Sequence, residues 1–536
     1  MHGSGIQSIE LVFLLLLLFV AGFTALARKL QTPYPIVLVV AGLLLSLIPG
    51  IPRVRLNPYL IFLVVLPPLL FAGAWLTSLR DFVHNLVSIS FLAFGLVTFT
   101  VLGVAGTAHV AFPGFDWRLG VVLGAVIATT DAIAATSIAK RVGLPQRVVD
   151  VLEGESLLND ATGLLALEFG IAIVVAGQTP TVTSGFLRLA YLTIAGIAVG
   201  LLIGAFVHWI EHQIDDGPIE ITISIMIPYA AYLAAESIHA SGVLAVVACG
   251  LYLGRASAHF FSPAVRIQAT AVWSVFTFIL NGFVFVLIGL QLPVVREGIR
   301  NYSSGTLLLY GGVFSALVIL LRLLWVFPGA RLAYWIRRHV LHQNETMPPA
   351  RQIFVLGWTG MRGVIALAAA LSLPEQLEDG SPFPQRNLII FLTFCVILVT
   401  LVLQGLTLPA LIRVLGLAGI AGPNCEETEA RRLMAEAALA KLEKASDEGD
   451  PDFAALYGDL QEHYRRRLSS LPRDGKKADG SAAGDYEKFL ALSLELLRVE
   501  RETAIQLRNS GRINDEVLRQ LLNELDLSET RYHAAA

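Results

Sequence analysis

Apolar runs long enough to cross a lipid bilayer recur from near the start of the chain to about residue 413. A spanning helix needs about 20 mostly apolar residues. Lipid also requires each segment to satisfy its own backbone hydrogen bonds, which an α-helix does. The sequence therefore predicts an all-α polytopic membrane protein with about thirteen transmembrane helices. The predicted spans, of which the ninth is short, lie at about 10–27, 34–49, 58–77, 86–107, 119–139, 150–176, 187–209, 219–236, 241–254, 271–292, 305–327, 353–373 and 388–413.

The composition of the chain excludes three classes of protein. Hydrophobic residues make up 55% of it and charged residues only 15%, whereas an ordinary soluble protein has about 25% charged residues. A water-soluble globular protein, a nucleic-acid-binding protein and a disordered chain are therefore excluded. The three cysteines, Cys249, Cys395 and Cys425, lie far apart, so we expect neither a disulfide framework nor a cysteine metal site, and no cofactor.

Charged residues divide the chain into two parts. Residues 421–536 hold 17 Lys and Arg against 23 Asp and Glu, whereas residues 1–420 hold 22 against 19. The first part therefore has a net charge of +3 and the last a net charge of −6. We predict a transmembrane domain at 1–415 and a soluble helical tail at 416–536.

The tail reads as helices joined by polar linkers. Residues 426–446 and 485–509 are amphipathic and rich in charge, and the Pro- and Gly-containing stretch 472–481 is predicted to be flexible. The tail has no phosphate-binding glycine loop, metal cluster or catalytic set of residues. Its role is therefore either that of a plain helical appendage or that of a regulatory or assembly element.

The basic residues of the short loops predict the orientation in the membrane. Loops on the cytoplasmic side carry an excess of Lys and Arg, and an outside N-terminus puts thirteen of them in inner loops and seven in outer ones. An odd number of spans then places the tail in the cytoplasm, with the protein in the cell (inner) membrane. Ala25-Leu26-Ala27 resembles a signal-peptide cleavage site. However, no basic residue precedes the first run and the run is too long, so we expect a span there.

Two carboxylates lie at membrane depth and are candidates for function. A charge there costs about 2.5–3.5 kcal/mol on insertion scales, and Asp131 and Asp160 both lie within predicted spans. Ser156 precedes Asp160 by four residues, so the two share a helix face, while Thr130 adds a hydroxyl beside Asp131. Asn159 points about 100° away from Asp160, which favours a bond to a neighbouring helix or to broken backbone. This oxygen-rich set suits a small monovalent cation better than zinc or calcium.

A second group of residues surrounds Arg362 in the twelfth span. Gly357, Gly360 and Gly363 weaken a helix there, or else allow close helix packing. The fifth span has its own weak point, the two threonines Thr129 and Thr130 before Asp131. Two interrupted helices in corresponding halves of a transporter indicate a binding site at the midplane of the membrane. Glu155 and Arg362 are both costly charges in lipid, so we expect them to form a buried ion pair across helices.

These strings resemble the bacterial sodium/proton antiporters of the monovalent cation:proton antiporter-1 family, relatives of the animal sodium/hydrogen exchangers. The resemblance covers about residues 10–415. It rests on Leu66-Pro67-Pro68-Leu69-Leu70-Phe71, Thr130-Asp131-Ala132, Gly154-Glu155-Ser156-Leu157-Leu158-Asn159-Asp160 and Arg362-Gly363-Val364. The Gly-Glu-Ser to Asn-Asp string is highly specific. The sequence departs from the family at Ala72-Gly73, where some members have an acidic residue, and this puts cation preference and pH response in doubt.

The resemblance implies two inverted repeats of six helices joined by the seventh, with helices five and twelve unwound and crossing beside the site, and a homodimer. It implies that sodium and protons bind at Asp160, with Asp131, Thr130 and Ser156 as further ligands of sodium. We place Asn159 in the same predicted cation- and proton-binding site. It makes Glu155–Arg362 a structural pair. The presence of Asn159 before Asp160 is typical of the electroneutral branch.

The predicted function is secondary transport that exchanges a monovalent cation, sodium or else lithium, for protons competing at Asp160. An empty ionised Asp160 is costly to move through lipid, so only the loaded carrier should switch sides. Potassium/proton exchange at the same site stays open, as does a membrane sensor or scaffold that acts through its tail. A channel is also conceivable, and tight coupling of the two ions would exclude it. An enzyme is not expected, because Gly154-Glu155-Ser156 lacks the second glycine of a nucleophile elbow and no His-Glu-x-x-His string occurs.

Overall fold

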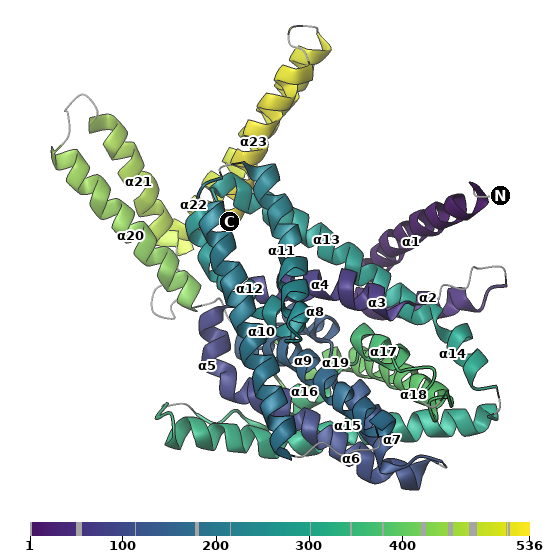
Figure 1. The fold of residues 1–536 in the computed structure, drawn as a ribbon. Coiled ribbons are helices and arrows are strands. Elements are labelled where there is room, and N and C mark those ends of the chain that lie inside the picture. The colour runs from purple at the N-terminus through teal and green to yellow at the C-terminus, as the bar shows by residue number, and fades with distance from the viewer. Residues whose placement is uncertain are drawn as a thin grey trace. The chain divides into compact units, whose positions relative to one another are not determined.

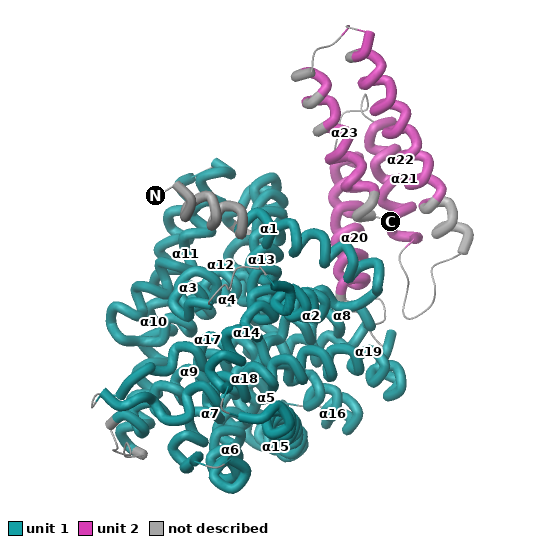
Figure 2. The backbone as a smooth tube through the Cα atoms, turned by 90° about the vertical axis from the view of Figure 1, so that its right-hand side faces the viewer, with its two compact units in different colours: residues 1–420 teal, residues 421–536 magenta. Residues whose placement is uncertain are grey.

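The chain is described by a computed structural model over residues 3–49, 56–112, 114–176, 182–214, 216–300, 302–343, 346–377, 380–419, 425–448, 454–470, 480–510, 512 and 515–535. It divides into two compact units, residues 1–420 and residues 421–536 (Figure 2). The assignment of residues 1–415 as the transmembrane domain and of residues 416–536 as the helical tail stays a prediction.

The first unit is built from helices throughout its described residues (Figure 1). Up to the middle of the chain they are α1 (Gly3–Lys29), α2 (Tyr34–Ser46), α3 (Pro58–Leu60), η1 (Ile61–Val65), α4 (Leu66–Leu76), α5 (Leu79–Ser90), η2 (Phe91–Leu96), α6 (Val97–Ala111), α7 (Trp117–Ala128), α8 (Ala132–Val142), α9 (Gln146–Ala176) and α10 (Val182–Glu211). The others are α11 (Gly217–Ser237), α12 (Gly242–Phe260), α13 (Pro263–Leu290), α14 (Leu292–Gly298), α15 (Ser304–His339), α16 (Ala350–Trp358), α17 (Val364–Leu371), α18 (Arg386–Val399), η3 (Thr400–Gln404) and α19 (Gly405–Val414). The segments η1, η2 and η3 are π-helical turns between α-helices.

Within the described residues, nine helical segments are long and apolar enough to cross a membrane. Two shorter apolar helices, Tyr34–Ser46 and Gly242–Ser257, accompany them. The prediction of an all-α, multi-pass membrane protein is confirmed, and the count of thirteen spans stays a prediction. Helix starts follow from local sequence: Asp116, Ser241 and Ser303 each accept a backbone N–H in the first turn of α7, α12 and α15.

Two of the spans are interrupted, as predicted, and the interruptions touch. Between α7 and α8 the backbone is extended at Thr129 and Asp131, and between α16 and α17 it leaves the helix from residue 359 to Gly363. The Asp131 amide donates a hydrogen bond of 2.9 Å to the Met361 carbonyl. A peptide N–H and C=O freed by the two breaks therefore satisfy each other, which lipid could not do.

The described residues of the second unit form four helices, α20 (Cys425–Glu448), α21 (Ala454–Ser470), α22 (Gly480–Asn509) and α23 (Asp515–Ala535). Each packs on the next along the chain, and Arg501 of α22 forms ion pairs with Asp526 and Glu529 of α23. The two predicted amphipathic segments fall within α20 and α22. The predicted flexible stretch 472–481 lies outside the described residues except for its last two positions.

Candidate functional site

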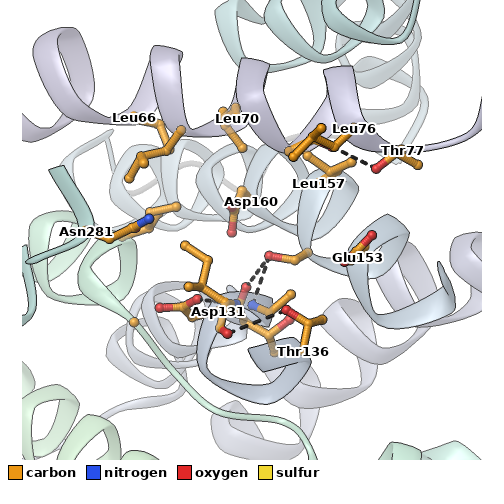
Figure 3. Close-up of a pocket in the computed structure, with 18 of the residues that line it drawn as sticks. Leu66, Leu70, Leu76, Thr77, Asp131, Thr136, Glu153, Leu157, Asp160 and Asn281 are labelled. Atoms are coloured by element: carbon orange, nitrogen blue, oxygen red, sulfur yellow. Dashed lines mark hydrogen bonds between the residues drawn. The ribbon is translucent and has the colours of Figure 1, made fainter. Parts of the chain in front are cut away.

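A cavity of about 330 Å³ opens beside both interruptions. Its wall comes from α4, α8, α9, α13 and the start of α17. Along α9 it extends from Gln146, Asp150 and Glu153 at one end to Asp160 at the other. Figure 3 shows Asp160 and Asp131 facing each other across the cavity, with Asn281 beside them and Glu153 at the far end. The cavity therefore leads along the N-terminal half of α9 to two buried carboxylates.

Asp160 is buried without a polar partner. Its side chain is only 2% exposed, and none of the hydrogen bonds or ion pairs between described residues involves it; Oδ1 in particular has no partner. Asp131, in contrast, caps α8, because its Oδ1 accepts the Ile133 amide at 2.8 Å. Its second oxygen takes no such bond. The carboxylate of Asp160 is thus free to bind a ligand at the buried end of the cavity.

The other residues predicted to bind the cation lie in the same place but already make hydrogen bonds with the broken backbone or with one another. Ser156 Oγ donates to the Thr130 carbonyl at 2.8 Å and accepts the Ala132 amide at 3.3 Å. Asn159 Nδ2 donates to Thr130 Oγ1, and that hydroxyl donates to Glu155 Oε1 at 3.3 Å. Ser156 thus satisfies backbone groups that the interruption leaves without helical partners, whereas Asn159 and Glu155 hold the Thr130 side chain.

The structure corrects the predicted Glu155–Arg362 pair. Glu155 is joined by two hydrogen bonds to Arg322 of α15, one of them 2.9 Å between Nη2 and Oε2. Both residues are 1–2% exposed. The prediction named the wrong arginine as the partner of Glu155. Helix α15 packs against α16 and η2, and this packing brings the Arg322 guanidinium to Glu155. The sequence marks Arg322 as an isolated charge but gives no sign of what it pairs with.

Each arginine also covers the carboxyl end of an interrupted helix. Arg362 Nη1 donates to the carbonyls of Ala128 and Thr129 at 3.3 and 3.4 Å, at the end of α7. Arg322 donates to the carbonyls of Leu356 and Gly357 at 3.1 and 3.2 Å, at the end of α16. Positive charge stabilises the negative end of a helix dipole, so the two arginines stabilise both interruptions.

The Ala72-Gly73 position, where some members of the resembled family have an acidic residue, contributes only a glycine to the cavity wall. Gly73 lines the cavity, and a β-carbon there would meet only Leu157 Cδ2 at 3.5 Å. At the far end of the cavity Lys140 pairs with Glu153 at 2.8 Å, and Gln146 Nε2 donates to Asp150 at 2.8 Å. Acidic side chains are therefore present at this end although none stands at Ala72-Gly73.

A second cavity, of about 270 Å³, begins where the first one ends along α9. Its lining includes Ala161, Thr162 and Glu168 of α9, together with parts of α10, α11 and α12. Glu168 pairs with Arg188 of α10 at 3.4 Å. Asp160 therefore lies between two cavities that follow opposite halves of the same membrane-spanning helix.

Gly363 permits the contact between the interruptions, and this gives a first testable prediction. A β-carbon at Gly363 would lie 2.5 Å from Asp131 Oδ2, so Gly363→Ala should displace that carboxylate and lower stability by about 1–3 kcal/mol. Thermal unfolding of the purified protein in detergent measures this. Gly312→Ala is the control, because a β-carbon there meets nothing within 4 Å. Equal melting temperatures for the two variants would contradict the prediction.

Similarity to known proteins agrees with this geometry. A family model described as the transmembrane sodium/hydrogen exchanger matches residues 14–414. The chain belongs to this family. The resemblance inferred from the sequence is confirmed.

Individual relatives support the same conclusion. An uncharacterized Na⁺/H⁺ exchanger of Mycobacterium tuberculosis (strain H37Rv) is 34% identical over 517 residues, which cover 95% of this chain and 93% of the relative. A sodium, potassium, lithium and rubidium/H⁺ antiporter of Bacillus subtilis is 31% identical over 537 residues, 97% of this chain and 78% of the relative. The solved sodium proton antiporter of Methanocaldococcus jannaschii at pH 8 shares the fold. Its TM-score is 0.58 at 19% identity, over 77% of this chain and 99% of that one.

Membership in the family makes this exchanger a multi-pass membrane transporter that couples a cation to protons, and not a typical enzyme. Sequence reasoning missed one polar residue of the site, Asn281 of α13, which lines the first cavity. The signal available was a lone amide in the otherwise apolar run from Phe278 to Leu290.

Proposed function

We propose that this exchanger moves one monovalent cation, sodium in the first place, against one proton, and that the two compete for Asp160. The observation that carries the proposal is a buried carboxylate without a partner at the end of a cavity. Such a group is costly in low dielectric unless it holds either a proton or a cation. Each ion then displaces the other, which is the coupling that antiport requires.

The proposed sodium ligands are the carboxylates of Asp160 and Asp131 with oxygens of Thr130 and Ser156. Hard monovalent cations prefer oxygen ligands, and these four residues border the first cavity. Asn159 is assigned to the supporting shell of the site through its bond to Thr130. Glu155 has the structural role predicted for it, with Arg322 as its partner.

The second cavity is the proposed approach to Asp160 from the outer face. The first cavity is the proposed inner approach, because its mouth carries Lys140, on the side where Lys and Arg are expected to concentrate. The tail is then cytoplasmic, and the protein lies in the cell (inner) membrane as a homodimer. These assignments extend the orientation that the basic loops predict.

Electroneutral exchange follows from a single exchanging carboxylate and gives a prediction. One proton against one monovalent cation moves no net charge, so the membrane potential performs no work on the cycle. In vesicles with a trapped pH dye, an imposed potential of about 100 mV should leave the sodium-driven proton flux unchanged within about twofold. A cycle that moved one net charge would instead gain or lose about 2.3 kcal/mol at that potential. A flux that rises or falls with the sign of the potential would contradict electroneutrality.

Potassium/proton exchange at the same site is the second candidate. It is favoured by the Bacillus subtilis relative, whose name includes potassium and rubidium beside sodium and lithium. The same vesicles, titrated separately with sodium, lithium and potassium, decide between the two. The first candidate is supported if sodium gives half-maximal proton release at a lower concentration than the other two ions. The second is supported if potassium does. No proton release with any of the three ions would reject both.

A further inference from the structure

Asn281 is a buried polar residue on the apolar helix α13, beside the first cavity. It lies on α13, is only 7% exposed, and borders the cavity together with Val284 and Phe285, three and four residues further along the same helix face. None of the hydrogen bonds between described residues uses its amide. The amide therefore borders the cavity without a partner among the described residues, where a water or a ligand can bond to it.

The oxygens predicted to hold the cation are partly committed elsewhere. Ser156 Oγ already makes two hydrogen bonds to the α7–α8 interruption. Thr130 Oγ1 accepts from Asn159 and donates to Glu155, and one oxygen of Asp131 is used to cap α8. Each of these hydroxyl oxygens keeps one lone pair, and Asp160 and the second oxygen of Asp131 are free of hydrogen bonds from the described residues. All of these oxygens come from α9 and the α7–α8 interruption, so the other side of a dehydrated cation needs an oxygen from water or from another wall of the cavity.

Asn281 stands on that other wall. Figure 3 shows its side chain directed into the cavity at the end where Asp160 and Asp131 lie. The helix that carries it packs mainly on α2, α11 and α1, whereas α7 and α8 pack on α9. An asparagine carbonyl is an oxygen ligand for hard cations, and its NH₂ group can donate to a carboxylate.

We propose that Asn281 is a cation ligand, contributing its side-chain carbonyl oxygen opposite Asp160 and thereby setting the affinity of the inward-facing site. This inference rests on the proposed function. When a proton replaces the cation, the same amide donates to the carboxylate pair instead. Asn281 thus satisfies the site in both loaded states without adding charge, which preserves a one-for-one exchange.

Replacing Asn281 tests the proposal in reconstituted vesicles titrated with sodium and with lithium. Asn281→Ala should raise the apparent KM for each cation about tenfold, with a maximal rate within about twofold of the wild type, because one oxygen ligand of the charged species is lost. Asn281→Asp keeps the oxygen and adds charge, so it should lower the KM. Ser315→Ala is the control: Ser315 is 1% exposed and donates to the Gly311 carbonyl within α15, away from the cavity.

The outcomes separate this inference from the proposed function. If the wild-type protein shows no cation-driven proton flux, the proposed function itself is rejected. A wild type that exchanges, with Asn281→Ala and Asn281→Asp both within twofold of its KM, would overturn only the role of Asn281. If Asn281→Ala is not monodisperse in detergent, Asn281→Ser takes its place; its smaller hydroxyl should raise the KM, and an unchanged KM would overturn the proposal.

Discussion

Replacing Asp160 with asparagine should reduce cation-driven proton flux to the level of protein-free vesicles, a loss of about 100-fold or more. Asparagine has the same shape, but it cannot release a proton to an arriving cation. The side chain is buried and has no partner to lose, so the variant should fold and melt like the wild type. The measurement is the initial rate of pH-dye response after a sodium pulse.

The matched control is Glu297→Gln, which makes the same change of group on α14 at a side chain that is 42% exposed. It should retain the wild-type rate. An Asp160→Asn variant that is well folded and still exchanges at a wild-type rate would remove Asp160 from the mechanism, whatever its position in the cavity.

Breaking the buried ion pair is the second large effect expected. Removing one partner of such a pair leaves an uncompensated charge and costs about 3–5 kcal/mol. Glu155→Gln should therefore lower the melting temperature strongly. Arg322→Gln should do at least as much, because the carbonyls of Leu356 and Gly357 lose their donor as well. Unfolding of detergent-solubilised protein, with retention of a monodisperse elution peak, measures both.

A double-mutant cycle identifies the partner of Glu155. The double variant Glu155→Gln, Arg322→Gln should be more stable than the sum of the single changes predicts, with a coupling energy above about 1 kcal/mol. The corresponding cycle with Arg362→Gln should give a clearly smaller coupling, since Arg362 donates to backbone carbonyls at the end of α7. A larger coupling with Arg362 would restore the pairing that the sequence predicted.

Much of the fold could be predicted from sequence because lipid makes the requirements strict. A spanning segment must be apolar, helical and about 20 residues long, and apolar runs are visible in any chain. The interruptions were predictable for a related reason. Glycines and a threonine near Arg362, and threonines before Asp131, mark places where a helix is weak and a freed peptide group can find a partner.

The pairing of charges could not be predicted in the same way. Glu155 and Arg322 are separated by 167 positions, and which arginine reaches the glutamate depends on how α15 packs, not on any local pattern. The predicted roles of Ser156 and Thr130 met a similar limit. Their spacing places their oxygens near Asp160. The sequence does not reveal that the Ser156 oxygen also bonds to the broken backbone, or that the Thr130 hydroxyl bonds to Asn159 and Glu155.

Competition for Asp160 is the central claim, and the dependence of sodium affinity on pH tests it most directly. If sodium and a proton bind the same carboxylate, then on the acidic side the apparent KM for sodium should rise about tenfold for each unit fall in pH, while saturating sodium restores the full rate. A maximal rate that falls with pH at a constant KM would contradict the account, because protons would then act somewhere other than at the cation site.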